Sequence, residues 1–420
     1  MKILIYGINF APDMVGIAKY TSEMSGWLSE RGHEVRVVTA PPYYPAWRVG
    51  EGYRAGQYRR ERSSWANGAA ADVWRCPLWV PEHPSGVKRL LHLASFAASS
   101  FPVMLRQAAW RPDVVVVVEP TLFCAPAALL AARLSGAKAW LHIQDLEVDA
   151  AFDMGLLPKG RVSRAALSFE RWLLRRFDRV STISEAMCDR VLSKGVDTER
   201  VGLFPNWVDV RSIAPMPHPS PFREELGLGD DTRVALYAGN LGEKQGLELL
   251  VDAAQRLRDR RDLVFVIAGG GSGRQRLENL AKGLPNVKFL PLQPLERLND
   301  LLNLADVHLL PQRADAADLV MPSKLTGMVA SGRSVVATAA PETQVSKVVA
   351  DCGIAVPPGD GAAFANAIVA LVDDAERRAA FGAAARSYAE SDLAQDAIME
   401  RFELEADALV GGTPHRAREN

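Results

Sequence analysis

Cysteine is scarce in this chain of 420 residues. The four thiols, at Cys76, Cys124, Cys188 and Cys352, lie far apart, and no pair has the C-x-x-C spacing of a zinc or redox site. Free cysteine usually behaves as a small buried apolar side chain. The sequence therefore predicts four buried free thiols and no cysteine-based metal site.

The chain also lacks an excess of charge of either sign. It has 49 Lys and Arg against 50 Asp and Glu, which leaves a formal net charge of −1. Nucleic-acid binding depends on positive charge that displaces counterions from phosphates, and this composition offers no such global charge. Nucleic acid is therefore not an expected partner, and an anionic ligand must be bound by local groups.

Long apolar runs are missing as well. No stretch reaches the roughly 18 apolar residues that a membrane-spanning helix requires. The first apolar run, residues 3–6 after Met1 and Lys2, is too short for a signal peptide and precedes no small-residue cleavage site. We therefore expect a cytoplasmic protein without an integral membrane segment.

Two ligand signatures are absent. The chain has no G-x-G-x-x-G, which argues against a nicotinamide-dependent dehydrogenase. It has no D-x-D, and the alternating carboxylates Asp145, Glu147 and Asp149 are either solvated or, as the alternative, a metal cluster. We expect a site that uses neither a metal nor an organic cofactor.

Short, uniformly apolar runs rich in β-branched residues recur between longer helical patterns. Such runs are typical of strands that are buried on both faces of a parallel sheet. The first series covers residues 3–7, 35–40, 114–118, 139–144 and 180–184. The second series covers residues 234–239, 263–269, 287–290, 307–311, 334–338 and 354–356. Two series predict two doubly wound α/β domains.

Proline marks the expected boundary between these domains. Residues 213–221 read IAPMPHPSP, and alternating prolines fix φ and remove backbone donors. We expect an N-terminal domain over residues 1–212 and a C-terminal domain over residues 213–392. Residues 393–410 have helical periodicity and could pack back on the N-terminal domain, and residues 411–420 form a tail.

Polar residues at strand ends are the candidates in the first domain. Gly16 lies where the first helix begins, so it either lets a phosphate or sugar approach the backbone or serves as a turn residue. Later strand ends carry Glu119 and then His142, Gln144 and Asp145. Ligands bind at the carboxyl ends of parallel strands, although a structural role for His142 is an equal alternative.

The second domain opens with a loop rich in hydrogen-bond donors. Residues 237–246 read YAGNLGEKQG and lead from a strand into a helix. From this loop Asn240, Lys244 and Gln245 can donate hydrogen bonds to a diphosphate.

A second helix start in the same domain has similar chemistry. Residues 321–324 read MPSK before a helix at 325–330. Proline favours the first helical turn, and Ser323 and Lys324 add a hydroxyl and a cation near the positive end of the helix dipole. Two such helix starts in one sheet predict one phosphate site, with a solvated Lys324 as the alternative.

A long apolar helix is predicted over residues 87–110. Lys88 and Arg89 lie at its beginning and Arg106 near its end. The helix either lies at a bilayer interface with these cations at the lipid headgroups, or simply covers the first domain.

These motifs together resemble the retaining GT-B glycosyltransferases of family 4. Within that family the chain is most similar to the colanic-acid-type exopolysaccharide transferases, described as fucosyltransferases. The resemblance spans nearly the whole chain and implies two Rossmann-like domains that face each other across a cleft. The strings that carry it are YGINFAP (6–12), APPYYP (40–45), PTLFCAP (120–126), LHIQD (141–145), FPNW (204–207), GNLGEKQGLE (239–248) and PSKLT (322–326).

The resemblance implies that the second domain binds a nucleotide sugar, such as GDP-fucose. The base and ribose would lie near residues 289–293, including Leu292. The diphosphate would lie at residues 240–246 and 323–326. These ranges add Gly246, Leu325 and Thr326 to the donor residues, and Gly16 would approach the donor from the first domain.

The acceptor, a lipid-linked exopolysaccharide intermediate, would then lie on the first domain near Tyr43 and Tyr44. The resemblance implies retention of configuration without a metal, through a front-face attack in which the departing phosphate takes the acceptor's proton. No protein nucleophile is then needed. The residues Glu119, His142, Gln144 and Asp145 would position sugar hydroxyls or the acceptor rather than form a hydrolase pair.

Three features depart from the common family pattern and motivate an alternative. The Arg and Lys of the first phosphate loop are replaced by Asn240 and Gln245. The two glutamates eight residues apart are missing, with Leu319 and Gly327 in their place, and the active-site histidine is replaced by Gln144. The alternative is a non-catalytic nucleotide-sugar-binding or scaffold subunit of a polysaccharide assembly complex.

Overall fold

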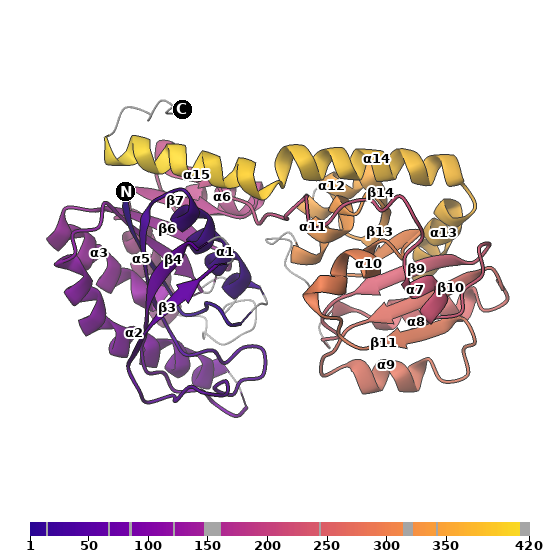
Figure 1. The fold of residues 1–420 in the computed structure, drawn as a ribbon, viewed down its shortest axis with the longest axis horizontal. Helices are drawn as coiled ribbons and strands as arrows, with labels where there is room; N and C mark the ends of the chain where they lie inside the picture. The colour runs from indigo at the N-terminus through magenta and orange to yellow at the C-terminus, as the bar shows by residue number, and fades with distance from the viewer. Residues whose placement is uncertain are drawn as a thin grey trace. The chain divides into compact units, whose positions relative to one another are not determined.

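The computed structural model describes residues 1–13, 16–65, 68–83, 86–120, 122–146, 161–242, 245–313, 322–341 and 343–411. The chain forms two compact units (Figure 1). Unit 1 comprises Met1–Pro205 and Met399–Asn420, and unit 2 comprises Asn206–Ile398. The first boundary therefore precedes the proline-rich residues 213–221, which belong to unit 2.

Unit 1 is built on an eight-stranded sheet. Its strands are β1 (Lys2–Gly7), β2 (Glu34–Thr39), β3 (Arg59–Ser64), β4 (Ala70–Arg75), β5 (Val114–Glu119), β6 (Lys138–Ile143), β7 (Arg179–Thr182) and β8 (Val201–Leu203). They lie in the order β3-β4-β2-β1-β5-β6-β7-β8, and every neighbouring pair is parallel except β3 with β4. All six residues of β5 are buried, as expected for a strand covered on both faces.

The described helices of unit 1 cover this sheet. They are α1 (Ile17–Glu30), α2 (Gly86–Ala108), α3 (Ala125–Ser135), α5 (Arg161–Leu174), α6 (Glu185–Ser193) and the greater part of α15 (Gln395–Val410). On α2, one side buries His92, Phe96 and Met104, while Val87 and Leu91 are exposed. No helix among the described residues is long and apolar enough to cross a bilayer.

The chain after Met399 completes the core of unit 1. Phe402 is buried on α15, with its ring centroid 4.6 Å from that of Trp140 and 5.1 Å from that of Phe204. On the same helix, Glu403 pairs with Arg31 at 3.0 Å and with His33 at 2.7 Å. Sequence periodicity predicted the helix, and these contacts show which unit its second part belongs to.

Unit 2 has a six-stranded, wholly parallel sheet. The strands are β9 (Arg233–Ala238), β10 (Leu263–Ala268), β11 (Val287–Leu290), β12 (Val307–Leu310), β13 (Ser334–Thr338) and β14 (Gly353–Val356), in the order β11-β10-β9-β12-β13-β14. The described helices are α7 (Phe222–Glu225), α8 (Glu248–Arg256), α9 (Arg274–Leu280), α10 (Leu298–Leu302), α11 (Ser323–Ala330), α12 (Gln344–Cys352), α13 (Gly361–Val372) and α14 (Ala375–Asp392). This is the doubly wound order, so the predicted fold class is confirmed.

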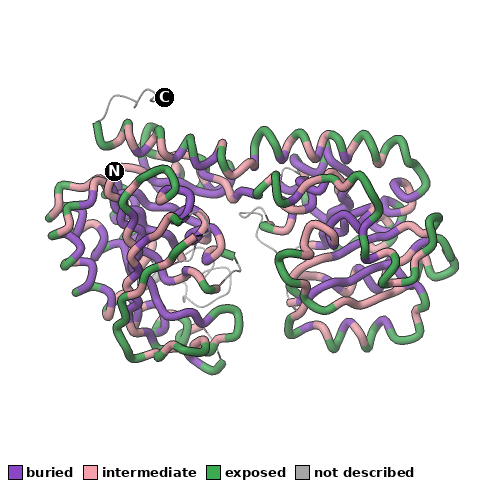
Figure 2. The backbone as a smooth tube through the Cα atoms, in the orientation of Figure 1, coloured by how far each residue is buried: buried purple, intermediate pink, exposed green. Residues whose placement is uncertain are grey.

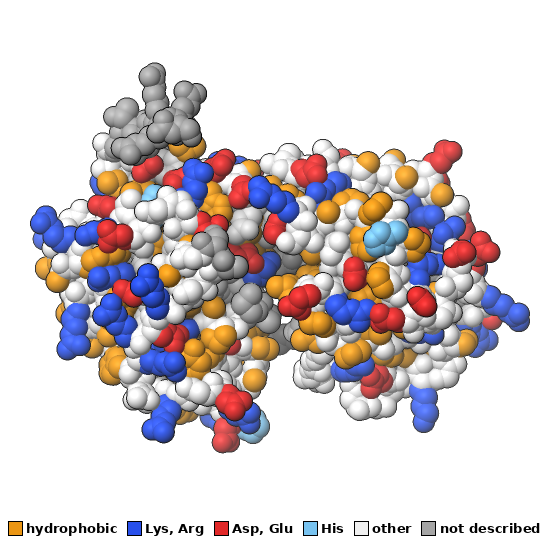
Figure 3. All heavy atoms as spheres, viewed as in Figure 1, with side chains coloured by type: hydrophobic (Ala, Val, Ile, Leu, Met, Phe, Trp, Pro, Cys, Tyr) orange, Lys and Arg blue, Asp and Glu red, His pale blue; other side chains and the backbone are white. Residues whose placement is uncertain are grey.

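Burial follows this layering in each unit. Buried residues line the strands and the inner sides of the helices, and exposed residues line the outer sides (Figure 2). One apolar cluster lies between the sheet of unit 2 and the helices α8 and α13, and another lies beneath α11, α12 and α14. Positive and negative side chains are interspersed over the face shown in Figure 3, in keeping with the small net charge.

Some sequence-based expectations need correction. The strands β3, β4 and β8 were not expected. Cys76, Cys124 and Cys352 are buried, but Cys188 is only half-buried; all four are free. The proline-rich segment is anchored within unit 2, because the Ala214 N–H donates to Asn299 Oδ1 and the Met216 N–H to Asn303 Oδ1, both at 3.0 Å.

Candidate functional site

Each sheet has one point where the chain order reverses. In unit 1 the neighbouring strands β1 and β5 lead to opposite sides of the sheet, and in unit 2 the strands β9 and β12 do so. Open α/β sheets bind ligands outside the carboxyl ends of strands at such a point. The residues that follow β1, β5, β9 and β12 are therefore the first candidates.

In unit 1 a cavity of about 200 Å³ lies at this point. It brings together four predicted residues from separate parts of the chain: Gly16, Tyr43, Tyr44 and Asp145. The other lining residues are Asn9, Ile17, Trp47, Arg89, His92, Leu93 and Pro120. Gly16 has φ 59° and ψ −132°, and a Cβ there would meet nothing within 4 Å. Position 16 therefore favours glycine because of its backbone conformation and not because of crowding, and the space above it is open.

Two residues that the sequence analysis missed hold the loops around this cavity. Arg75, at the end of β4, is buried; it donates to the carbonyls of Ala11 and Ala40 and pairs with Glu61 at 2.8 Å. Asp13 accepts hydrogen bonds from the N–H groups of Tyr43 and Tyr44, at 3.1 and 3.2 Å. These contacts fix the loop after β1 against the loop after β2. No local motif marks them, because they join segments far apart in the sequence.

Asp145 and Arg89 supply opposite charges to the cavity. Burial raises the pKa of Asp145, and the positive charge of Arg89 opposes that rise. Arg89 comes from the first turns of α2, where the sequence had suggested a lipid contact. The structure therefore places one of the two leading cations of this helix at the ligand cavity, which the prediction did not foresee.

His142 and Gln144 lie beneath the surface of unit 1 and do not line the cavity. His142 Nδ1 is 3.0 Å from Ser181 Oγ, and its Nε2 is 2.9 Å from Gln144 Nε2. Burial lowers the pKa of His142 to about 3. The ring is therefore neutral at physiological pH, and it supports the loop that carries Asp145. Glu119 is also buried, at the end of β5, and the next residue, Pro120, lines the cavity.

In unit 2 the two predicted phosphate loops meet at Lys324. Its Nζ donates to Tyr237 Oη and to Gln245 Oε1, both at 2.5 Å. Tyr237 Oη lies 2.8 Å from the Asn240 carbonyl oxygen, which ties the loop after β9 to the same group. Burial lowers the pKa of Lys324 to about 8. The solvated alternative for Lys324 is thus excluded, because its ammonium lies in a polar cluster below the loop.

The start of α11 and the glycine after β9 shape this cluster. A Cβ on Gly239 would clash with the Cε of Lys324, so a side chain there would displace the end of the lysine, and the φ of 149° at this position also favours glycine. Pro322 precedes the helix and offers no side-chain cap. The Leu325 N–H donates to the Pro322 carbonyl at 2.9 Å, and the N–H groups of Ser323 and Lys324 precede it at the position where helix starts bind anions. Ser323, the first helical residue, is exposed.

The remaining predicted donor residues differ in accessibility. Leu325 is fully buried, and the buried Thr326 donates its hydroxyl proton to the Ser323 carbonyl at 2.8 Å. Neither side chain is placed to meet a ligand. Leu292, two residues after β11, is 73% exposed and is available to one. Lys244 lies outside the described residues, as do Glu147, Asp149 and Leu319.

Arg313 is a further cation at the unit 2 site. It follows the end of β12 and is exposed, and a Cβ on Gly246 would lie 3.0 Å from its Cγ. The strand itself is predicted by its apolar run, but Arg313 lies three residues beyond its end, outside that run. A search for cations just beyond each predicted strand would have found Arg313.

Comparison with known proteins assigns both units to related families. Residues 15–207 match the glycosyl transferase 4-like domain, and residues 232–374 match glycosyl transferases group 1. The chain is 47% identical over 412 residues to the colanic acid biosynthesis glycosyl transferase named WcaI from Escherichia coli K12. That alignment covers 96% of this chain and 98% of the relative.

Solved structures share the fold. Sucrose-phosphate synthase from Thermosynechococcus elongatus superposes with a TM-score of 0.75 at 17% identity and covers 98% of this chain and 100% of its own. HepE from Anabaena, solved in complex with UDP, gives a TM-score of 0.67 at 18% identity and covers 97% of this chain and 100% of its own. At these identities the likeness concerns the fold, and it confirms the GT-B assignment.

Proposed function

We propose a donor site, an acceptor site and a mechanism for this chain, which belongs to the glycosyltransferase family of glycosyl transferase 4-like and group 1 domains. In this proposal unit 2 binds a nucleotide diphosphate sugar and unit 1 binds a glycan acceptor. The observation that carries it is the buried ammonium of Lys324, held where the loop after β9 meets the start of α11.

The donor diphosphate would bind above Lys324. A desolvated cation is costly unless it is compensated, and among the described residues the hydrogen-bond partners of the half-buried Lys324 are the neutral oxygens of Tyr237 and Gln245. A diphosphate would supply the missing negative charge. Arg313 follows the carboxyl end of β12, and α11 is the next helix in the chain, so we propose that Arg313 and the first N–H groups of α11 share the contact.

Sugar transfer leaves a nucleoside diphosphate with additional negative charge. Stabilising that leaving group with fixed cations and helix N-termini lowers the barrier more than any contact to the intact donor does. Lys324, Arg313 and α11 fit this role without a metal. We propose retention of configuration by front-face attack, in which the departing phosphate takes the acceptor's proton.

The acceptor would occupy the cavity of unit 1. Asp145, Arg89 and Asn9 line it and can bind sugar hydroxyls, and Tyr43 and Tyr44 give it aromatic walls. His142, being neutral and buried, would position Gln144 and Asp145 and transfer no proton itself. The relative in colanic acid biosynthesis supports a glycan of exopolysaccharide synthesis as the acceptor. We propose, from the sequence resemblance, that this glycan is lipid-linked and that the donor is GDP-fucose.

Nucleotide binding by the purified protein tests the donor site. Calorimetry with GDP-fucose, GDP-mannose, UDP-glucose and UDP-galactose identifies the donor. Lys324→Ala should weaken binding of that donor about tenfold or more, because a charge-assisted contact contributes roughly 1.5 to 3 kcal/mol. Lys347→Ala, an exposed lysine of α12, is the matched control. Equal affinities of a folded Lys324→Ala and wild type would remove Lys324 from the site.

The same preparation separates an enzyme from a non-catalytic subunit. An enzyme should hydrolyse its donor slowly without acceptor and transfer the sugar in its presence. A protein that binds the donor but neither hydrolyses nor transfers it would be the scaffold subunit instead.

A further inference from the structure

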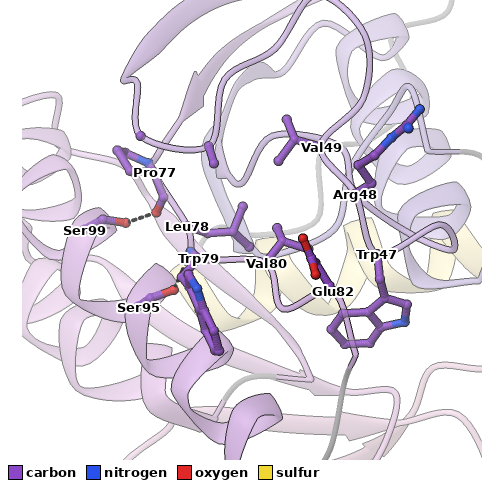
Figure 4. A pocket seen from close by; sticks show the side chains of 12 residues that line it. Trp47, Arg48, Val49, Pro77, Leu78, Trp79, Val80, Glu82, Ser95 and Ser99 are labelled. Atoms are coloured by element: carbon purple, nitrogen blue, oxygen red, sulfur yellow. Dashed lines mark hydrogen bonds between the residues drawn. The ribbon is translucent and has the colours of Figure 1, made fainter.

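Unit 1 has a second and larger cavity beside α2. Its volume is about 610 Å³, about three times that of the first cavity and within the range of roughly 300 to 1,000 Å³ that is typical of small-molecule sites. It lies between the segment after Tyr43, the segment after β4, and the side of α2 that carries Ser95 and Ser99. Figure 4 shows Trp47 and Trp79 on two sides of this cavity, with Val80 and Glu82 between them.

Trp47 lines both cavities of unit 1. Its ring lies 5.7 Å from Tyr43 in an edge-on arrangement and 5.3 Å from His92. Its backbone has φ 51°, which is rare for a bulky residue and persists only where the surroundings determine it. Trp47 is therefore a fixed partition, and a ligand that fills the first cavity can continue over it into the second.

Trp79 forms the opposite wall and is 45% exposed. Its backbone N–H donates to Ser95 Oγ at 2.9 Å, and its carbonyl lies 2.6 Å from His92 Nδ1. The neighbouring Ser99 hydroxyl donates to the Pro77 carbonyl, as the dashed line in Figure 4 shows. The helix therefore holds this wall in place, and the indole remains open to solvent.

The chemistry of the cavity selects its ligand. Two indoles and the aliphatic floor of Val49, Leu78 and Val80 offer apolar faces, while the exposed Arg48 and Glu82 offer hydrogen bonds and charge. A pyranose ring has the matching surfaces, an apolar C–H face and a rim of hydroxyls. A hydrocarbon chain would use only the apolar faces and would form no hydrogen bond with Arg48 or Glu82.

We infer that this cavity is a second acceptor subsite, which binds sugar residues of the acceptor glycan beyond the residue that occupies the first cavity. The inference rests on the proposed function, because it takes the first cavity as the place of the accepting sugar. It makes Trp79 a residue that selects acceptors by chain length, at a distance from the transferred group.

Acceptor length is the test. Colanic acid is partially hydrolysed, and fragments of one or two sugars are separated from fragments of six. Binding of each fragment to the full-length protein is measured by calorimetry. Wild type should bind the longer fragments more tightly. Trp79→Ala should weaken their binding roughly tenfold while leaving short fragments unaffected, and Trp79→Phe should retain most of the affinity because it keeps an aromatic face. Thermal unfolding of each variant checks that unit 1 remains folded.

Three results would overturn the inference. The first is equal affinity of wild type for short and long fragments, or no binding of either. The second is a folded Trp79→Ala that binds long fragments normally. The third uses geranylgeranyl phosphate as a probe for the lipid part of the acceptor. If Trp79→Ala keeps sugar binding but loses binding to this lipid, the cavity binds the lipid and not the glycan. Donor binding and donor hydrolysis are measured in parallel, and their absence in wild type would reject the proposed function itself.

Discussion

Lys324 carries a charge in surroundings that disfavour it. Burial lowers its pKa to about 8, well below the usual value of 10.5. Between these two pH values the unfolded chain binds more protons at this residue than the folded chain does, so the free energy of unfolding rises with pH through that range. A bound diphosphate reverses the preference, because it stabilises the protonated form.

Donor binding should therefore depend on pH near neutrality. The protonated fraction of Lys324 in the free protein falls about tenfold between pH 7 and pH 9, and the affinity for the nucleoside diphosphate should fall by about the same factor. Calorimetry in buffers of different ionisation enthalpy should show proton uptake on binding. Lys324→Met should bind weakly with little dependence on pH over this range. A wild-type affinity constant from pH 7 to pH 9 would contradict the assignment.

The helix α2 covers unit 1, and we expect it to contact membranes as well, although the sequence left these two roles as alternatives. One side is buried against unit 1, and the other exposes Lys88, Val87 and Leu91. We expect this exposed side to dock on anionic membranes, where a basic residue near the surface contributes about 1 kcal/mol and the interaction weakens with salt. Such docking would bring the acceptor cavity close to a lipid-linked glycan.

Lys88→Glu together with Leu91→Ser should release the protein from phosphatidylglycerol vesicles in a flotation assay at low salt. Arg89 is left unchanged because it lines the acceptor cavity. Arg106→Glu, at the far end of the same helix, is the control for a general effect of charge. If wild type ignores the vesicles, α2 serves only as a covering helix.

The helix α15 makes a stability prediction. Phe402 is buried between Trp140 and Phe204, whereas Leu404, two residues later, is 56% exposed. Phe402→Ala should destabilise unit 1 by about 3 to 5 kcal/mol because it leaves a cavity in the core. Leu404→Ala should change stability by no more than about 0.5 kcal/mol. Denaturant unfolding measures both, and similar values for the two would show that α15 adds little to the core.

Strands were predictable where their sequences are continuous apolar runs. Parallel strands such as β5 and β13 are buried on both sides, so their sequences are continuous apolar runs. The strand β3 reads RRERSS; it pairs antiparallel at the sheet edge, and no apolar pattern marks it. Its neighbour β4 alternates in burial, and β8 has only three residues.

The same reasoning explains which site residues could be found. Gly16, Lys324 and Gln245 each lie in a short motif next to a predicted strand, so the local sequence is enough to identify them. Arg75 and Asp13 act through contacts with loops about 30 to 64 residues away, which only the fold brings together. The neutral state of His142 depends on its burial, and a strand pattern does not reveal the partners of its ring.

For the whole molecule, the prediction concerns metal ions. In the proposed function, Lys324, Arg313 and the start of α11 would supply the positive charge that a divalent cation supplies to the leaving group in other enzymes, so we expect turnover to survive excess EDTA. The rate of sugar release from the donor, with and without chelator, is the measurement. Loss of activity that Mg²⁺ or Mn²⁺ restores would instead give Asp145, with Glu147 and Asp149, a role in metal binding.

Unit 1 is completed by the last residues of the chain. Its first part ends at Pro205, and Phe402 arrives only after all of unit 2 has been made. At about 5 to 20 residues per second on the ribosome, Phe204 waits roughly 10 to 40 s for Phe402 to be made, and Trp140 waits roughly 13 to 50 s. Unit 2 is contiguous in sequence and can finish folding during that delay. During synthesis unit 1, although it is begun first, is thus the second of the two units to be completed.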